Sequence, residues 1–155
     1  MPSDFPMPAV SAAHRPDLRV AIEAMPASKW LGLRVVGFAA AGLAVLELDV
    51  RPDLTFDGRV VQGGLVGTLA DYAGVSAAAA SLAAGWGAST TGFEVHNLAP
   101  AVGDTLVAIG RAAAVGMSQA VSRVEVWAVT RGRPSVMVAI ATTTCRPMEW
   151  GGATG

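Results

Sequence analysis

Cysteine and net charge are both nearly absent from this sequence. Cys145 is the only cysteine among 155 residues, so no internal disulfide can form and no metal-ligand spacing of cysteines exists. The 11 basic residues almost balance the 12 acidic ones, and the formal net charge is -1. Such a balance gives no long-range attraction to nucleic acid or to an anionic membrane. We therefore expect neither partner and no metal site, and a reducing compartment for which the cytoplasm is the default.

Long apolar stretches are scarce as well. The N-terminal segment carries prolines where a signal peptide needs an apolar core. The most apolar run, residues 63–84, is interrupted by Asp71 and consists mainly of alanine and glycine, which is typical of a buried helix rather than a membrane span. With 52% hydrophobic residues, the chain suits one compact domain. We predict a flexible arm over residues 1–15, a single domain over 16–148 and a tail over 149–155.

The spacing of apolar residues predicts an α+β fold. Leu18, Ile22 and Met25 recur at helical spacing between Pro16 and Pro26, which predicts a short helix that ends at the second proline. Alternating apolar residues then predict two strands joined as a hairpin. A long helix and four further strands follow, at Leu65–Ala84, Ser89–Leu98, Thr105–Ala114, Gln119–Thr130 and Ser135–Arg146. Strands and helices do not alternate, so the pattern favours six antiparallel strands wrapped around one long central helix.

A glycine pair precedes the long helix. Gln62-Gly63-Gly64 would place unpaired backbone N–H groups and the positive end of the helix at one point, which suits a carbonyl oxygen that becomes negative. Asp71 follows Gly63 by two helical turns, roughly 12 Å at 1.5 Å per residue. The carboxylate of Asp71 is therefore too far away to act on a carbonyl held by Gly63 of the same chain. This spacing predicts a site built from two subunits.

Several ordered phrases carry a resemblance to a known family. They are Trp30-Leu31-Gly32-Leu33-Arg34-Val35-Val36, Gly58-Arg59-Val60-Val61-Gln62-Gly63-Gly64, Thr68-Leu69-Ala70-Asp71, Asn97-Leu98-Ala99-Pro100-Ala101 and Gly103-Asp104-Thr105-Leu106. With these phrases, residues 20–146 resemble the phenylacetate-degradation (PaaI-like) type of hotdog-fold thioesterase. The resemblance implies a hotdog fold and the hydrolysis of an acyl-CoA thioester to the free acid and CoA, with no cofactor. It also implies a homodimer and a dimer of dimers, that is, a homotetramer.

The resemblance also implies roles for individual residues. The N–H of Gly63 would form the oxyanion hole, and Asp71 would serve as nucleophile or as the base that activates water. A hydroxyl near Thr90, on the strand of the other half-site, would orient that water. Gln62 stands where the family usually has histidine, and its amide can donate a hydrogen bond but cannot titrate near neutral pH. These four residues, Asp71, Gly63, Gln62 and Thr90, are the predicted catalytic set.

Eight further residues are predicted to bind the substrate: Phe56, Gly64, Gly92, His96, Asn97, Gly116, Met117 and Ser118. Phe56 replaces the asparagine or glutamine that the family places seven residues before the oxyanion glycine, so a medium-chain or aryl acyl group is favoured. Met117 follows the hairpin glycine where relatives often carry a basic residue near coenzyme A. Structural interpretations stand beside these roles: Thr90 is a good strand residue, and a strand histidine such as His96 is more often structural.

Two other functions remain open from the sequence. The departures at Phe56 and Gln62 favour a non-catalytic protein that binds or senses acyl-CoA. A hydratase acting on enoyl thioesters is the third hypothesis, although it needs an Asp/His pair and position 62 supplies no histidine.

Overall fold

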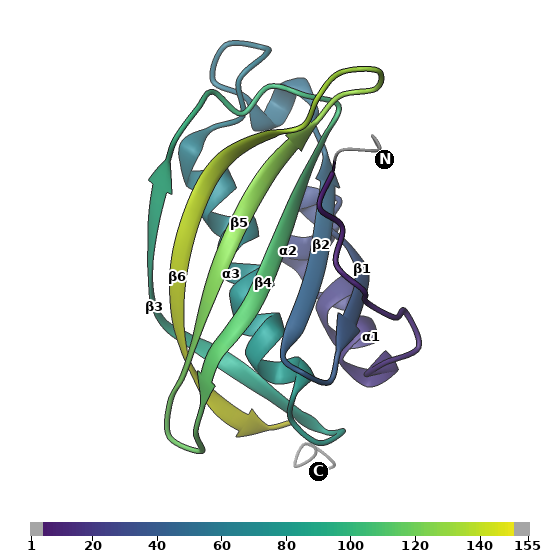
Figure 1. Ribbon diagram of the computed structural model, residues 1–155, viewed down its shortest axis with the longest axis vertical. Coiled ribbons are helices and arrows are strands. Elements are labelled where there is room, and N and C mark those ends of the chain that lie inside the picture. The colour runs from purple at the N-terminus through teal and green to yellow at the C-terminus, as the bar shows by residue number, and fades with distance from the viewer. Residues whose placement is uncertain (1–4, 151–155) are drawn as a thin grey trace.

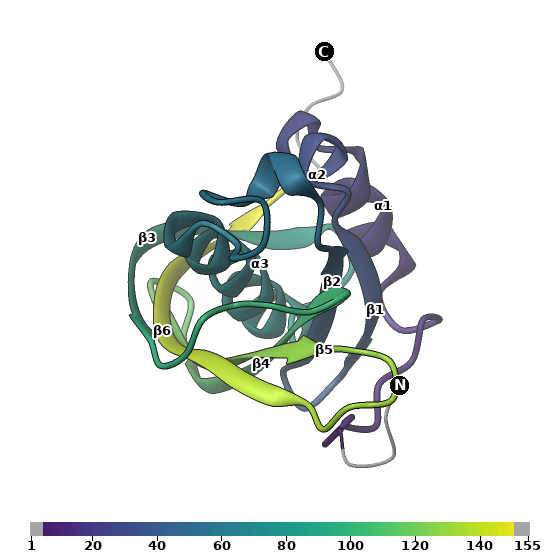
Figure 2. The ribbon, with the colours of Figure 1, turned by 90° about the horizontal axis from the view of Figure 1, so that it is seen from above.

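One helix lies inside a strongly curved antiparallel sheet (Figures 1 and 2). The computed structural model describes residues 5–150. The central helix is α3 (Gly63–Ala80). The strands are β1 (Arg34–Ala39), β2 (Leu43–Asp49), β3 (Trp86–Asn97), β4 (Thr105–Val115), β5 (Ala120–Val129) and β6 (Val136–Glu149), in the spatial order β1-β2-β4-β5-β6-β3. Every neighbouring pair is antiparallel. The predicted α+β architecture is confirmed.

Small residues allow α3 to lie very close to the sheet. Its buried face consists largely of alanine and glycine. A Cβ atom built on Gly74 would overlap the side chain of Thr143 on β6, and one built on Gly110 of β4 would overlap the backbone of Ala73. Both glycines therefore mark points where helix and strand are in direct contact, with no room for a larger side chain.

Several predicted boundaries differ from the observed ones. The predicted short helix does end before Pro26, since α1 spans Pro16–Ala24, but the second helix α2 (Pro26–Leu31) was not predicted. In α2 the proline takes a first-turn position that needs no N–H donor. Helix α3 begins two residues before the predicted Leu65 and ends four residues before Ala84. The short 3-10 helix η1 (Pro52–Leu54) was not predicted.

The N-terminal segment is packed against the sheet from Phe5 onward, where the sequence had predicted a flexible arm. The ring of Phe5 makes an edge-to-face contact with Trp127, with 6.0 Å between ring centroids. Ser11 forms a backbone bridge to Phe38 of β1. At the other end, β6 runs to Glu149, and Trp150 packs against the main core. Residues 1–4 and 151–155 of the predicted arm and tail lie outside the described residues.

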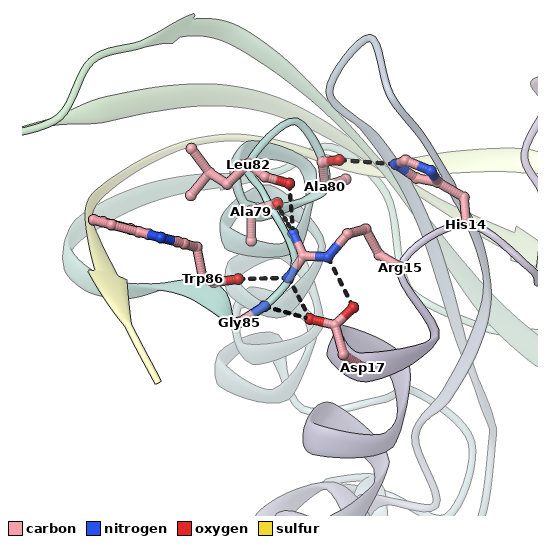
Figure 3. A network of polar contacts seen from close by, with 8 residues as sticks. All are labelled: His14, Arg15, Asp17, Ala79, Ala80, Leu82, Gly85 and Trp86. Carbon is pink, nitrogen blue, oxygen red and sulfur yellow. Dashed lines mark hydrogen bonds and ion pairs between the residues drawn. The ribbon is translucent and has the colours of Figure 1, made fainter. Parts of the chain in front are cut away.

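A buried arginine joins the end of α3 to the start of β3 (Figure 3). Arg15 is only 7% exposed, and its guanidinium donates hydrogen bonds to three backbone carbonyls, those of Ala79 at 2.6 Å, Leu82 at 3.0 Å and Trp86 at 2.6 Å. The first two carbonyls belong to the C-terminal end of α3 and the turn after it, where helical acceptors lack partners. We call this arrangement, with Asp17, the Arg15 clamp.

Asp17 completes the clamp from the first turn of α1. Its carboxylate accepts two hydrogen bonds from Arg15, at 2.8 and 2.9 Å, and one from the N–H of Gly85 at 3.0 Å. The Arg15 guanidinium holds the pKa of this carboxyl well below its usual range. Arg15 has a φ of 51°, in the left-handed region, which costs a non-glycine residue about 1–2 kcal/mol. The hydrogen bonds of the guanidinium offset that strain.

Replacing Arg15 with methionine should destabilise the fold by about 3 kcal/mol, because the buried carbonyls and the Asp17 carboxylate lose their donor while the apolar stem is kept. Chemical denaturation of parent and variant measures the free energy of unfolding. Arg19→Met is the matched control, since Arg19 is about one-third exposed and, within residues 5–150, its side chain pairs only with Glu23 at 3.5 Å, so its loss should stay within about 0.5 kcal/mol. Equal losses in the two variants would contradict the assignment of the clamp.

Candidate active site

Asp71 lies in the middle of α3, beside Thr90 of β3. The hydroxyl oxygen of Thr90 is 3.0 Å from each carboxylate oxygen of Asp71, and it donates its proton to that carboxylate. The two residues are brought together within one chain, whereas the resemblance had implied a hydroxyl from the other half-site. Helix α3 packs directly on strand β3. Because of this packing, Asp71 in the middle of the helix lies beside Thr90 of the strand.

The surroundings of Asp71 favour a basic carboxylate. Burial raises the pKa of Asp71, and the hydrogen bond from Thr90 lowers it by a smaller amount, so the pKa lies above its ordinary value. Desolvation has this effect because the charged form loses water that apolar neighbours do not replace. A carboxylate with a raised pKa, placed in a cavity, is a better base and nucleophile than an exposed one.

Asp71 opens into a mostly apolar pocket of about 410 Å³. The wall formed by α3 is one stripe with helical spacing: Thr68, Asp71, Tyr72, Val75, Ser76 and Ala79. The remaining lining residues come from β3, from α1 and α2 and from the C-terminal segment: Ala88, Ser89, Thr90, Leu18, Ile22, Met25, Ala27 and Trp150. We call this cavity the Asp71 pocket. Sequence reasoning missed every contribution of α1, α2 and Trp150, although the apolar spacing of Leu18, Ile22 and Met25 had marked a face that must be covered.

The glycine pair lies at the N-terminal end of α3. Gln62 precedes the first turn, and its carbonyl accepts hydrogen bonds from Leu65 and Val66 at 2.9 and 3.2 Å. Within residues 5–150, no hydrogen bond uses the backbone N–H of Gly63 or Gly64. These N–H groups at a helix N-terminus can therefore receive a carbonyl oxygen or an oxyanion.

A second pocket, of about 450 Å³, adjoins Gly63. Its lining includes Phe56 and Asn97, so the structure brings these predicted substrate-binding residues together with the predicted oxyanion glycine. A Cβ atom on Gly63 would lie 3.1 Å from Nδ2 of Asn97. Phe56 is 67% exposed and offers an apolar ring at this end of the helix. We call this cavity the Gly63 pocket.

The two pockets occupy different parts of one chain. Gly63 adjoins Asn97 and Asp71 adjoins Thr90, so the pockets lie at separate points along the α3 and β3 pair. Asp71 follows Gly63 by eight residue steps along the helix, which correspond to roughly 12 Å. A single chain therefore does not bring the carboxylate and the helix N-terminus to the same carbonyl group.

The remaining predicted strand residues lie apart from Asp71. His96 bonds to Glu94 at 2.7 Å, and both line a hollow on the sheet together with Arg111 and Arg123. His96 and Asn97 therefore face different cavities, as expected for consecutive strand residues. Gly92 lies at a register shift of β3, where its carbonyl accepts a hydrogen bond from Thr144 at 3.1 Å.

The predicted hairpin residues lie at the turn between β4 and β5. The N–H of Gly116 donates to the carbonyl of Gln119 at 2.9 Å, and Met117 and Ser118 are exposed. Met117 lines a hollow with Arg146 and Ser89, and Ser89 also lines the Asp71 pocket. The hairpin therefore lies beside Ser89 but contributes no side chain to the lining of the Asp71 pocket.

Residues 5–150 contain no cluster of three or more His, Cys, Asp or Glu side chains that could hold a metal ion. In the same part of the chain, no helix has the length and apolarity needed to cross a membrane. The buried thiol of Cys145 has a pKa raised by desolvation and by the Asp71 carboxylate, which keeps it protonated and unreactive.

Solved structures of thioesterases share this fold. A thioesterase family protein from Silicibacter pomeroyi matches with a TM-score of 0.80 and 22% identity over 88% of this chain and 99% of that chain. A thioesterase from Haemophilus influenzae gives 0.73 and 16% over 91% and 94%. The PaaI protein of the E. coli phenylacetic acid degradation operon gives 0.71 and 23% over 89% and 96%. No protein-family model and no curated protein matches the sequence. The resemblance to hotdog-fold thioesterases is confirmed at the level of the fold.

Replacing Thr90 with valine should raise the pKa of Asp71 further, because the hydrogen bond that favours the charged carboxylate is removed while the burial remains. Carbon NMR titration of the Asp71 carboxyl group measures the change. Thr68→Val is the matched control, since the Thr68 hydroxyl also lines the pocket but donates to the carbonyl of Gly64 at 2.9 Å, and it should leave the Asp71 pKa unchanged. A pKa that stays constant, or falls, in Thr90→Val would refute the pairing.

Proposed function

We propose that this protein hydrolyses acyl-CoA thioesters to the free acid and CoA. The observation that carries the proposal is the half-buried Asp71 carboxylate, held by Thr90 at the wall of a mostly apolar pocket. Such a pocket suits the acyl group, and the carboxylate suits attack on its carbonyl carbon. The fold shared with solved thioesterases supports the same reaction class.

The proposed reaction uses two features of α3. The thioester carbonyl oxygen accepts hydrogen bonds from the N–H groups of Gly63 and Gly64, whose partial positive charge stabilises the oxyanion as it forms. Asp71 either removes a proton from the attacking water or attacks the carbonyl carbon itself to form an anhydride that water then hydrolyses. In either route the C–S bond breaks, the sulfur leaves as CoA thiol after protonation, and a carboxylic acid is released. No metal or redox cofactor takes part.

The proposed site needs two copies of the chain. Strand β3 is an edge strand, with β6 as its only sheet neighbour among residues 5–150. Phe93 on this strand and Leu98 just after it are 49% and 55% exposed, and a long exposed edge with apolar side chains favours pairing with another strand. We propose that two β3 strands pair antiparallel in a homodimer. The resemblance extends this assembly to a dimer of dimers.

The position of the two-fold axis follows from the two pockets. If the axis passes through Glu94, so that Glu94 lies opposite its own copy, the irregularity of β3 at Thr90 and Thr91 lies opposite Asn97 of the second copy. Opposite residues of an antiparallel pair lie about 5 Å apart and point to the same face. Thr90 adjoins Asp71 and Asn97 adjoins Gly63, so this register brings Asp71 of one copy towards Gly63 of the second copy. Symmetry then gives two equivalent sites per dimer.

Gln62 and Phe56 complete the proposed site at the Gly63 end. The Gln62 side chain makes no hydrogen bond within residues 5–150 and is exposed, so its amide is free to contact the thioester region. Phe56 offers an apolar surface in the Gly63 pocket, where relatives of the PaaI-like type have a polar side chain. We also propose a cytoplasmic location, because acyl-CoA is present there and a reducing compartment suits the free thiol of Cys145.

Asp71→Asn should lower turnover on acyl-CoA substrates by about a hundredfold or more, because the variant keeps the shape of the side chain but has neither a base nor a nucleophile. Thiol release from a panel of acyl-CoAs measures turnover. Asp53→Asn is the matched control, since Asp53 is an exposed carboxylate paired with Arg51 at 3.2 Å and lies outside both pockets, and it should retain parent turnover.

Two outcomes would count against this proposal. A folded Asp71→Asn protein with parent turnover would exclude the assigned role of Asp71. A parent protein that binds acyl-CoA but releases no thiol would instead support the binding or sensing function, which the replacements at Phe56 and Gln62 favour.

A further inference from the structure

One end of the Asp71 pocket is formed by segments that are remote in sequence. Along α3 its lining runs from Thr68 past Asp71 to Ala79, and along β3 it runs from Thr90 back to Ala88. The C-terminal end of α3 and the start of β3 are held together by the Arg15 clamp through the carbonyls of Ala79 and Trp86. The pocket therefore ends at the clamp, on the side away from Gly63.

Trp150 lies at this end. Its side chain lines the pocket, and its backbone N–H donates to the carbonyl of Gly85 at 2.7 Å. A Cβ atom built on Gly87 would overlap the indole ring, so the ring lies flush on the backbone of β3 at a position where only glycine leaves room. The indole is thereby held by contacts on β3 and is part of the pocket wall.

The Arg15 clamp fixes the surface on which Trp150 rests. Asp17 accepts a hydrogen bond from the N–H of Gly85, and the carbonyl of the same residue receives the hydrogen bond from Trp150. Figure 3 shows the hydrogen bonds that join Gly85 to Asp17 and Trp86 to Arg15. The indole therefore rests on backbone that is anchored on both sides, and a ligand cannot displace that backbone without breaking buried hydrogen bonds.

We infer that Trp150 sets the upper length of the acyl group, an inference that rests on the proposed function. Gly87 precedes Thr90 by three steps along the strand, which gives a depth of roughly 10 Å at 3.3 Å per residue. An extended hydrocarbon with bonds of about 1.5 Å advances somewhat less than that per carbon, so the depth corresponds to about eight carbons. The substrate class is apolar acyl groups of about this length or shorter, with the acyl tail pointing from Asp71 towards Trp150.

The test compares the parent with Trp150→Ala over straight-chain acyl-CoAs from acetyl to tetradecanoyl in two-carbon steps. The parent should lose kcat/KM by about tenfold or more for each step beyond its limit. Trp150→Ala should move that limit to longer chains and raise the ratio of dodecanoyl to octanoyl hydrolysis by about tenfold or more. Trp150→Phe, which keeps a smaller ring on Gly87, should shift the limit in the same direction by less. Trp30→Ala is the matched control, since Trp30 is 57% exposed on α2 and lies outside the pocket.

Binding measurements separate failure of this inference from failure of the proposed function. The same panel is titrated into Asp71→Asn and into the Asp71→Asn, Trp150→Ala double variant, and the Kd is measured for each acyl length. A length profile that shifts in these titrations while the parent protein hydrolyses no acyl-CoA would retain the inference about Trp150 and reject the hydrolase. Length profiles that are the same with and without the Trp150 substitutions, both in hydrolysis by the Asp71 proteins and in binding by the Asp71→Asn proteins, would overturn the inference whatever the activity.

Discussion

Close contact between α3 and the sheet is the constraint on which the site depends. Gly74 of α3 contacts the side chain of Thr143 on β6, and Gly110 of β4 contacts the backbone of Ala73 on α3. Helix α3 therefore lies nearer to β4 and β6 than a helix with larger residues could. The same approach places the α3 carboxylate of Asp71 within hydrogen-bonding distance of Thr90. A bulkier residue on the buried face would separate the layers and leave the carboxylate buried without its partner, at a substantial cost in free energy.

The raised pKa of Asp71 and the buried Arg15 clamp show how the fold tolerates polar groups near its core. Asp71 keeps one hydroxyl partner, enough to hold its orientation but not enough to cancel the effect of desolvation on its pKa. Arg15 has the opposite environment, since backbone carbonyls and Asp17 surround its guanidinium. The clamp is therefore fully paired and structural, while the Asp71 carboxylate retains free acceptor capacity that faces a pocket.

Sequence patterns predicted the layers of the fold but not the residues that close the pocket. Six strands and a central helix followed from local apolar periodicity, and the Gly63 and Asp71 pair followed from a motif. The end of α3 could not be predicted, because the alanines after Ala80 favour continued helix and the residue that takes the end carbonyls, Arg15, is more than sixty positions away. Trp150 gave no local signal for the same reason, because its ring packs on Gly87 of β3, which is remote in sequence. Long-range packing decides such features, and a local pattern does not contain it.

The central claim is that Asp71 of one copy acts on a thioester held by Gly63 of a second copy. Mixing two inactive variants tests it directly. Gly63→Pro deletes the N–H donor at a first-turn position that suits proline, and the φ of -54° and ψ of 128° of Gln62 suit a residue before proline. Asp71→Asn deletes the carboxylate. After the two proteins are unfolded together and refolded, random pairing in symmetric dimers should restore roughly a quarter of parent activity, because each mixed dimer holds one intact site. Mixed protein that is no more active than the two variants measured separately would contradict the shared site.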